Sequence, residues 1–155
     1  MRFDEEWRLL VRARTWLGER GYRLVDSRGP EGMEQGFDIY VGESLAIRIV
    51  ADRGTWSVDV RPGRIEGDWF GYEGWFDLEE WSTCLRAPVV FHDTRQPVSD
   101  QDWVEVIESS WRLSPQLEYL RGHLATIEEA CHPTRVEQTK ACLEESERRR
   151  MPSPA

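Results

Sequence analysis

Alternating apolar residues between positions 37 and 61 constrain the fold more than any other feature of the sequence. The clearest part places Trp56, Val58 and Val60 on one side of an extended chain, with polar residues between them. Such a period of two is typical of a β-strand that is buried on one face. Two preceding segments alternate in the same way, with apolar residues at Phe37, Ile39 and Val41 and at Leu45, Ile47 and Ile49. Together they predict an antiparallel meander with one buried face.

Two short turns connect these strands. Gly42 and Glu43 fit a two-residue hairpin turn. Asp52, Arg53 and Gly54 fit the second turn, where we expect a positive φ at Gly54 and a hydrogen bond between the Asp52 side chain and nearby backbone. The same three residues are the most distinctive short motif of the chain.

Helical periodicity flanks the strands on both sides. Residues 3–20 carry apolar side chains at helical spacing, interrupted at Arg14. Ser99 is a suitable helix cap, and from there onward the chain again has a helical pattern. Spacings of three and four recur between Leu113 and Cys131, which is a short heptad seam. The helix after Ser99 has its apolar positions at Trp103, Val106, Ile107 and Trp111.

A short helix is expected between the sheet and these C-terminal helices. Asp77 and Glu80 have the spacing of a capping box, and the helix extends to about Leu85. Because the dipole of a helix stabilises negative charge at its N-terminus, Glu79 and Glu80 need no catalytic explanation.

These elements predict an α+β fold. It consists of an N-terminal amphipathic helix, a three- or four-stranded antiparallel sheet and a C-terminal helical region, and 155 residues suffice for one domain with a real core. We expect the first helix to lie over the buried face of the sheet, and the last two helices to form an antiparallel hairpin that closes on the sheet or on a second copy. The α+β part spans residues 1–98 with an acidic aromatic segment at 65–83, the helical region packed on it spans 99–150, and the tail spans 151–155.

The net charge of −9 comes from one stretch of the chain. Residues 65–111 contain eleven acidic and two basic residues, whereas the segments on either side are balanced. The same stretch holds five of the eight tryptophans. An acidic segment rich in aromatic residues favours a basic protein partner and disfavours nucleic acid.

Part of this charge has no structural explanation. Clustered like charges repel one another, so a purely structural role gains nothing from placing them together. Asp77, Glu79 and Glu80 fit a helix start, but the three acidic residues before them do not. We therefore predict that the surface that meets a basic partner is formed by Glu66, Asp68 and Glu73 with the exposed members of Trp69, Tyr72 and Trp75.

The chain shows no spacing typical of a metal or catalytic site. Its three histidines, His92, His123 and His132, have no partner at ligand spacing. The three cysteines, an odd number without a close pair, are interpreted as buried and inert, which favours a reducing cytoplasm. We therefore expect no metal and no cofactor, and binding is favoured over catalysis.

No apolar run approaches the roughly 18 residues that a membrane span needs, so no membrane contact is expected. Nineteen of the twenty basic residues are arginine, which indicates a GC-rich genome. A homodimer through the C-terminal helices is expected if the sheet does not cover the seam from Leu113 to Cys131.

The segment Leu45 to Val60 lies between an amphipathic helix and the acidic helix that starts at Asp77. In this arrangement the chain resembles, over about residues 3–85, small immunity-type proteins of bacterial polymorphic-toxin systems and their uncharacterised relatives. The resemblance implies a non-enzymatic bacterial binding protein that neutralises a basic toxin by occluding its active site.

Two other interpretations of the tryptophans stay open. They can line the pocket of a small-molecule-binding or accessory enzyme domain. They can also simply fill the core. Exposure separates the three: a partner surface needs exposed tryptophans, a ligand site needs them around a hollow, and a core buries them.

Overall fold

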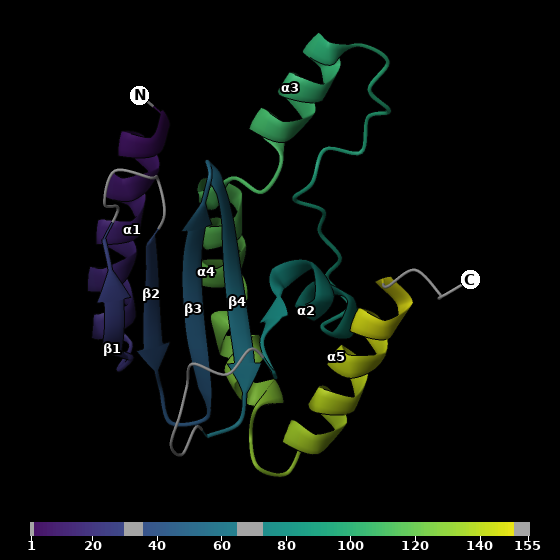
Figure 1. Ribbon diagram of the computed structural model, residues 1–155. Coiled ribbons are helices and arrows are strands. Elements are labelled where there is room, and N and C mark those ends of the chain that lie inside the picture. Colours follow the sequence, from purple (N-terminus) through teal and green to yellow (C-terminus); the bar gives the residue numbers. More distant parts are fainter. Residues whose placement is uncertain (1, 30–35, 65–72, 151–155) are drawn as a thin grey trace.

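A computed structural model of the chain describes residues 2–29, 36–64 and 73–150. It confirms the predicted α+β fold, with an N-terminal helix, an antiparallel sheet and C-terminal helices (Figure 1). The loop predicted near residues 30–35, most of the acidic aromatic segment (65–72) and the tail at 151–155 lie outside the described residues.

Within the described residues the sheet has five strands, one more than the upper number predicted. Each strand pairs antiparallel with the next along the chain, as in a meander. The strands are β1 (Arg23–Arg28), β2 (Gly36–Val41), β3 (Leu45–Asp52), β4 (Thr55–Pro62) and β5 (Phe76–Asp77). The additional strand, β5, has only two residues, which is too short for an alternating pattern to reveal.

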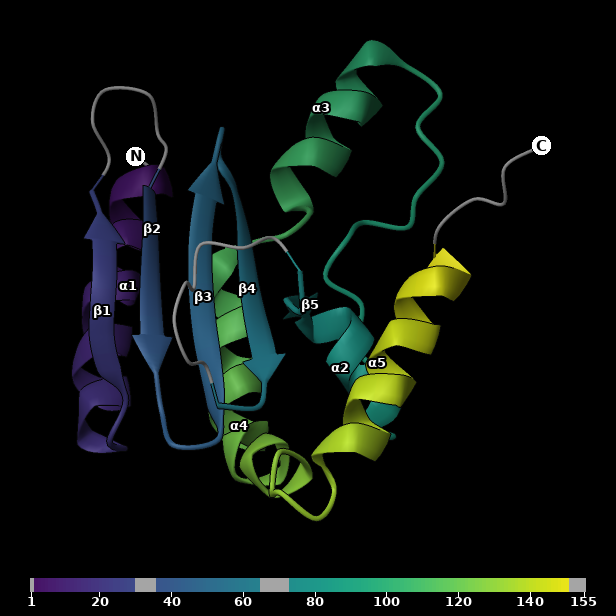
Figure 2. The same ribbon diagram turned by 60° about the horizontal axis from the view of Figure 1, so that its bottom comes forward.

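Four of the five helices in the described part of the chain pack around the sheet. They are α1 (Arg2–Glu19), α2 (Leu78–Cys84), α4 (Leu113–Ala130) and α5 (Val136–Arg150). In both views α1 lies behind β1 and β2, and α4 lies behind β3 and β4 (Figure 1, Figure 2). Beyond β4, α2 lies next to β5, and α5 packs on α2. The remaining helix, α3 (Asp100–Ser109), projects from the body of the molecule.

The core lies between the sheet and the layer formed by α1 and α4. Trp56, Val58 and Val60 are buried in it, as the alternation predicts. The seam of α4 faces the same core, where Leu120, Leu124 and Ile127 are completely buried. The sheet therefore covers the seam within one chain, and this removes the reason for expecting a dimer through it.

The apolar side chains of β2 point away from the core, unlike those of β3 and β4. On β2, Asp38 and Tyr40 are buried on the side of α1, whereas Ile39 belongs to a small apolar cluster on the other face of the sheet. The guanidinium group of Arg14 donates to both carboxylate oxygens of Asp38, at 2.7 and 3.0 Å, and the Tyr40 hydroxyl donates to the same carboxylate at 2.6 Å. The interruption at Arg14 in the apolar pattern of α1 is therefore the site of an ion pair with the sheet.

The two last helices do not form the predicted antiparallel hairpin. α5 packs mainly against α2, and a disulfide bond between Cys84 and Cys142 joins these two helices. The apolar face of α5 is thin, with Leu143 as its one buried apolar side chain, so it offers little surface for packing against α4.

Groups from α4, from α2 and from Trp111 close the edge of β4. The Val58 amide donates to the side-chain oxygen of Gln116 at 2.9 Å, and the Gln116 amide donates to the Trp56 carbonyl at 2.9 Å. The Trp56 amide donates to the carbonyl of Trp111 at 2.9 Å, and the Trp81 indole donates to the Val60 carbonyl at 3.0 Å. These bonds satisfy backbone groups that β5 is too short to reach.

Candidate partner-binding surface

The predicted binding residues lie mostly outside the described part of the chain. Glu66, Asp68, Trp69 and Tyr72 fall within residues 65–72, which the structure does not describe. Glu73 is exposed, as a binding role requires. The partner-binding role of this segment stays a prediction.

Trp75 is buried and is not one of the exposed aromatic residues that the prediction needs. It is 7% exposed and packs with Ile39 and Ala46 on the sheet face that is opposite α1. The guanidinium group of Arg48 lies 4.7 Å from its ring centroid and also pairs with Asp59 at 2.7 Å. A cation over an indole ring stabilises both groups, so Trp75 serves the fold.

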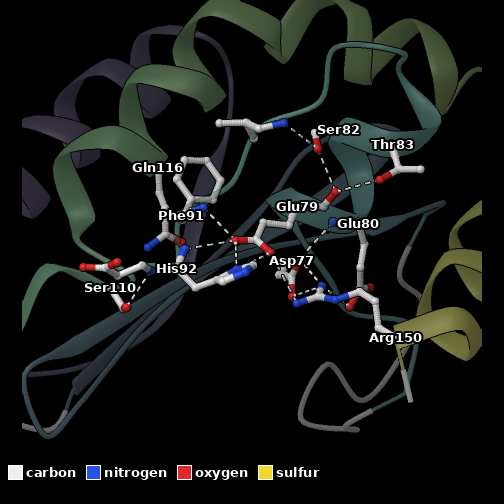
Figure 3. Close-up of polar contacts among 12 residues, drawn as sticks. Asp77, Glu79, Glu80, Ser82, Thr83, Phe91, His92, Ser110, Gln116 and Arg150 are labelled. Atoms are coloured by element: carbon white, nitrogen blue, oxygen red, sulfur yellow. Dashed lines mark hydrogen bonds and ion pairs between the residues drawn. The ribbon is translucent and has the colours of Figure 1, made fainter. Parts of the chain in front are cut away.

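The carboxylates of α2 have structural roles, as their position at a helix start predicts. The Asp77 side chain accepts the Glu80 amide at 2.9 Å, which confirms the predicted N-cap. Glu79 is buried and accepts the backbone amides of Phe91 at 2.7 Å and His92 at 3.2 Å (Figure 3). The Nδ1 atom of His92 lies 2.9 Å from the same carboxylate. Glu79 therefore fixes the chain that leaves α2.

One arginine bridges all three of these carboxylates. The Nη1 atom of Arg150, at the end of α5, donates to Asp77 at 2.8 Å and to Glu80 at 3.0 Å (Figure 3). Its Nη2 atom lies 3.5 Å from Glu79. The guanidinium group offsets part of the mutual repulsion, so this part of the acidic stretch is partly neutralised from within the chain.

Burial makes the Glu80 carboxyl group a weaker acid than an ordinary glutamate. Removal of the side chain from water, together with the negative charge of Asp77, raises the pKa of Glu80 to about 8, although Arg150 acts in the opposite direction. Its second carboxylate oxygen, Oε2, is buried and has no hydrogen-bond partner among the described residues. A neutral carboxyl group tolerates such a site far better than a charged one.

We therefore expect stability to fall as the pH rises from about 4.5 to about 8. The folded pKa of Glu80 lies above its usual value of 4.5, so in this range the folded protein holds a proton that the unfolded chain has released. Thermal unfolding at about pH 5 and at about pH 8 should show a melting temperature several degrees lower at the higher pH. Glu80→Gln, which cannot titrate, should reduce this difference, whereas the exposed control Glu137→Gln should keep it. Equal pH dependence in wild type and Glu80→Gln would contradict the assignment.

The acidic stretch continues on α3, where charge and exposed apolar side chains occur together. The helix carries Asp100, Asp102, Glu105 and Glu108. Ser99 is its N-cap and accepts the Asp102 amide at 3.1 Å, as predicted. α3 buries none of its residues within the described structure, so the predicted apolar positions Trp103 and Ile107 are exposed. The periodicity of the sequence identified this apolar face but could not show that the rest of the described structure leaves it exposed.

The disulfide bond corrects the interpretation of two cysteines as inert. Cys84 and Cys142 are bonded to each other, and only Cys131 fits the predicted buried thiol, whose pKa burial raises to about 12. Structural disulfides are typical of oxidising compartments. The expectation of a reducing cytoplasm therefore loses the argument from the cysteines. The two residues lie 58 positions apart, and no local spacing indicates their pairing.

The motif Asp52, Arg53 and Gly54 is a tight turn between β3 and β4. Arg53 has φ 52° and Gly54 has φ 85°, and the positive φ of Gly54 was predicted. Two positive φ values in succession match the twist of a hairpin. The Thr55 hydroxyl donates to the Asp52 carbonyl at 2.8 Å, so the motif has a structural role here.

The hollow between Trp56 and Trp111 is small. Trp56 and Trp111 line it together with Asp77, and its volume is about 200 Å³. Pockets for small molecules usually have about 300 to 1,000 Å³. The structure therefore gives little support to a tryptophan-lined ligand pocket at this place.

The described residues contain no group of three or more His, Cys, Asp or Glu side chains placed to hold a metal ion. Among the same residues, no helix has the length and apolar character needed to cross a membrane. Comparison of the chain with protein-family models, curated proteins and solved structures finds no match.

Proposed function

We propose that this chain is a non-enzymatic protein-binding protein whose acidic surface meets a basic protein partner. The observation that carries the proposal is the charge on α3, where Asp100, Asp102, Glu105 and Glu108 stand on a projecting helix. The nearby Arg95 pairs with Asp93 at 2.7 Å and with Glu105 at 3.3 Å. Most of the negative charge of α3 therefore remains available to a partner.

Such a surface acts first on the rate of association. Exposed carboxylates of one sign attract a basic surface over about a Debye length, which is roughly 8 Å at physiological salt. They raise the association rate and exclude acidic partners, while adding less to the final affinity. The resemblance to immunity-type proteins supports a specific version of the proposal, in which the partner is a basic toxin whose active site the chain occludes.

The experiment starts from a cross-link at Glu73, the exposed residue of the predicted binding segment. A photoreactive amino acid at this position is irradiated in cells that produce the protein, and the adduct is identified by mass spectrometry. The captured protein is then purified, and its association with the chain is measured by stopped flow at low and at high salt. An acidic partner, or an association rate that salt does not change, would contradict the proposal.

Charge reversal in the predicted segment gives a sharper prediction. The triple variant Glu66→Lys, Asp68→Lys and Glu73→Lys should associate about tenfold more slowly at low salt because it loses electrostatic steering. Its thermal unfolding should stay close to that of wild type. The matched control changes three exposed carboxylates on α4 and α5 to lysine: Glu118, Glu137 and Glu144. A wild-type association rate for the first variant at low salt would show that residues 66–73 are not the binding surface.

A further inference from the structure

We infer that α3 is a docking helix, whose apolar side enters an apolar groove with a basic rim on the partner protein. The inference rests on the proposed function and names the part of the chain that makes the central contact. Binding then depends on one helix and not on a uniform acidic surface. The apolar side chains of this helix supply affinity, and its carboxylates supply orientation.

The apolar side chains of α3 are exposed. Trp103, Val104 and Ile107 are 56%, 47% and 57% exposed, and Val98 just before the helix is 89% exposed. Trp103 and Ile107 are four residues apart and are therefore neighbours on one side of the helix. A helix of a globular domain normally buries such a stripe. A contiguous exposed apolar patch on a folded protein marks an interaction site.

α3 is firmly attached to the rest of the molecule at its C-terminal end. The Trp111 amide donates to the Phe91 carbonyl, and its carbonyl accepts the Trp56 amide of β4, both at 2.9 Å. The Ser109 hydroxyl donates to the Asp93 carboxylate at 2.6 Å, and the Asp93 amide donates to the Ser110 hydroxyl at 2.8 Å. The helix thus projects from a fixed base (Figure 2). A preformed and fixed helix loses less conformational entropy on binding than a loose segment does.

The negative charge of α3 selects the kind of partner. Each copy of α3 carries Asp100, Asp102, Glu105 and Glu108, and Arg95 already pairs within the chain. Two copies packed through this helix would bring both sets of carboxylates together without further cations. Anionic lipid surfaces and nucleic acid repel the helix for the same reason. A basic protein is the occupant that complements it.

The positions of the carboxylates define the rim of the groove. Asp102 precedes Val106 by four residues, and Glu108 follows Val104 by four. Residues four apart are neighbours on a helix surface, so one carboxylate flanks the apolar stripe on each side. A groove that accepts this helix therefore has apolar walls and basic side chains along both edges, which is the usual arrangement for recognition of an amphipathic helix.

The test uses a photoreactive amino acid at position 103 and the double variant Trp103→Ala with Ile107→Ala. We expect cross-linking at position 103 to capture the same basic protein as cross-linking at Glu73. The double variant should bind the purified partner at least about 30-fold more weakly in calorimetry, because truncated aromatic anchors usually cost about 2 kcal/mol or more. Its melting temperature should match that of wild type, because both side chains are exposed.

The matched control removes two other exposed apolar side chains, Val11→Ala on α1 and Leu24→Ala on β1, which are 45% and 41% exposed. It should bind as wild type does. Wild-type affinity of the Trp103/Ile107 variant, combined with slow association of the charge-reversed variant, would overturn the docking helix and leave the proposed function intact. If neither variant affects binding, the docking helix and the binding role of residues 66–73 both fail. An adduct at position 103 that contains only a second copy of the chain, or no adduct there, also overturns the inference.

Discussion

Replacing both Cys84 and Cys142 with serine should lower the free energy of unfolding by about 4 kcal/mol. The disulfide bond closes a segment of 58 residues between α2 and α5. A cross-link over such a length restricts the unfolded chain, and its removal returns that conformational freedom to the unfolded state. This is a large part of the 5 to 15 kcal/mol that stabilise an ordinary domain.

The loss of stability should be greatest in α5. Leu143 and Ser146 are its only buried residues in the described structure, so few apolar contacts hold the helix in place. The ion pairs of Arg150 with the α2 carboxylates remain in the serine variant, but they are partly exposed and contribute less. Without the disulfide, hydrogen exchange of the α5 amides should accelerate much more than exchange of the sheet amides.

Urea unfolding with and without a reducing agent measures this effect. Reductant should shift the wild-type midpoint to that of the serine variant and should leave the variant unchanged. Arg150→Gln is a useful comparison, since it removes the charged contact of α5 and keeps the disulfide. A wild-type midpoint that does not respond to reductant, after loss of the disulfide has been verified by mass spectrometry, would contradict this account of α5.

Local signals explain which elements could be predicted from the sequence. Asp77 and Ser99 were correctly predicted as helix caps because a cap depends on residues three positions apart. β4 was correctly predicted from the alternation of Trp56 with its neighbours, and that pattern persists because one face is buried. Each of these signals lies within a few residues of the chain.

Contacts between distant residues explain what the sequence did not reveal. On β2, Asp38 faces the helices and pairs with Arg14 of α1, and the disulfide of Cys84 with Cys142 joins α5 to α2. In neither pair does the spacing of the two residues in the sequence indicate that they are in contact.

Burial of the candidate site was equally hard to predict. An apolar stripe shows that a helix has one apolar side but does not show what covers it, so the sequence left open whether Trp103 fills the core, and the structure shows it exposed. The reverse holds for Trp75, which lies within an acidic segment and yet is buried under Arg48. The charge excess of the stretch is a property of the sequence itself, so it could be recognised without any structure.

Gln116→Leu on α4 should lower the free energy of unfolding by about 3 kcal/mol. Gln116 is completely buried, and its side chain accepts the Val58 amide while donating to the Trp56 and Arg112 carbonyls. Leucine has a similar size but can neither donate nor accept. The substitution therefore leaves an amide and a carbonyl of the β4 edge buried without partners, and each such group costs about 1 to 3 kcal/mol.

Urea unfolding of Gln116→Leu and of the exposed control Gln138→Leu on α5 tests this expectation. The control should remain within about 0.5 kcal/mol of wild type. The effect of Gln116→Leu should also reach α3, because Trp111, which follows that helix, is bonded to the same edge of β4 through the Trp56 amide. Hydrogen exchange at Trp56 and Val58 should therefore increase together with exchange at Trp111. If Gln116→Leu unfolds at the wild-type midpoint, the edge of β4 does not depend on this side chain, and the fixed base assigned to α3 loses one of its supports.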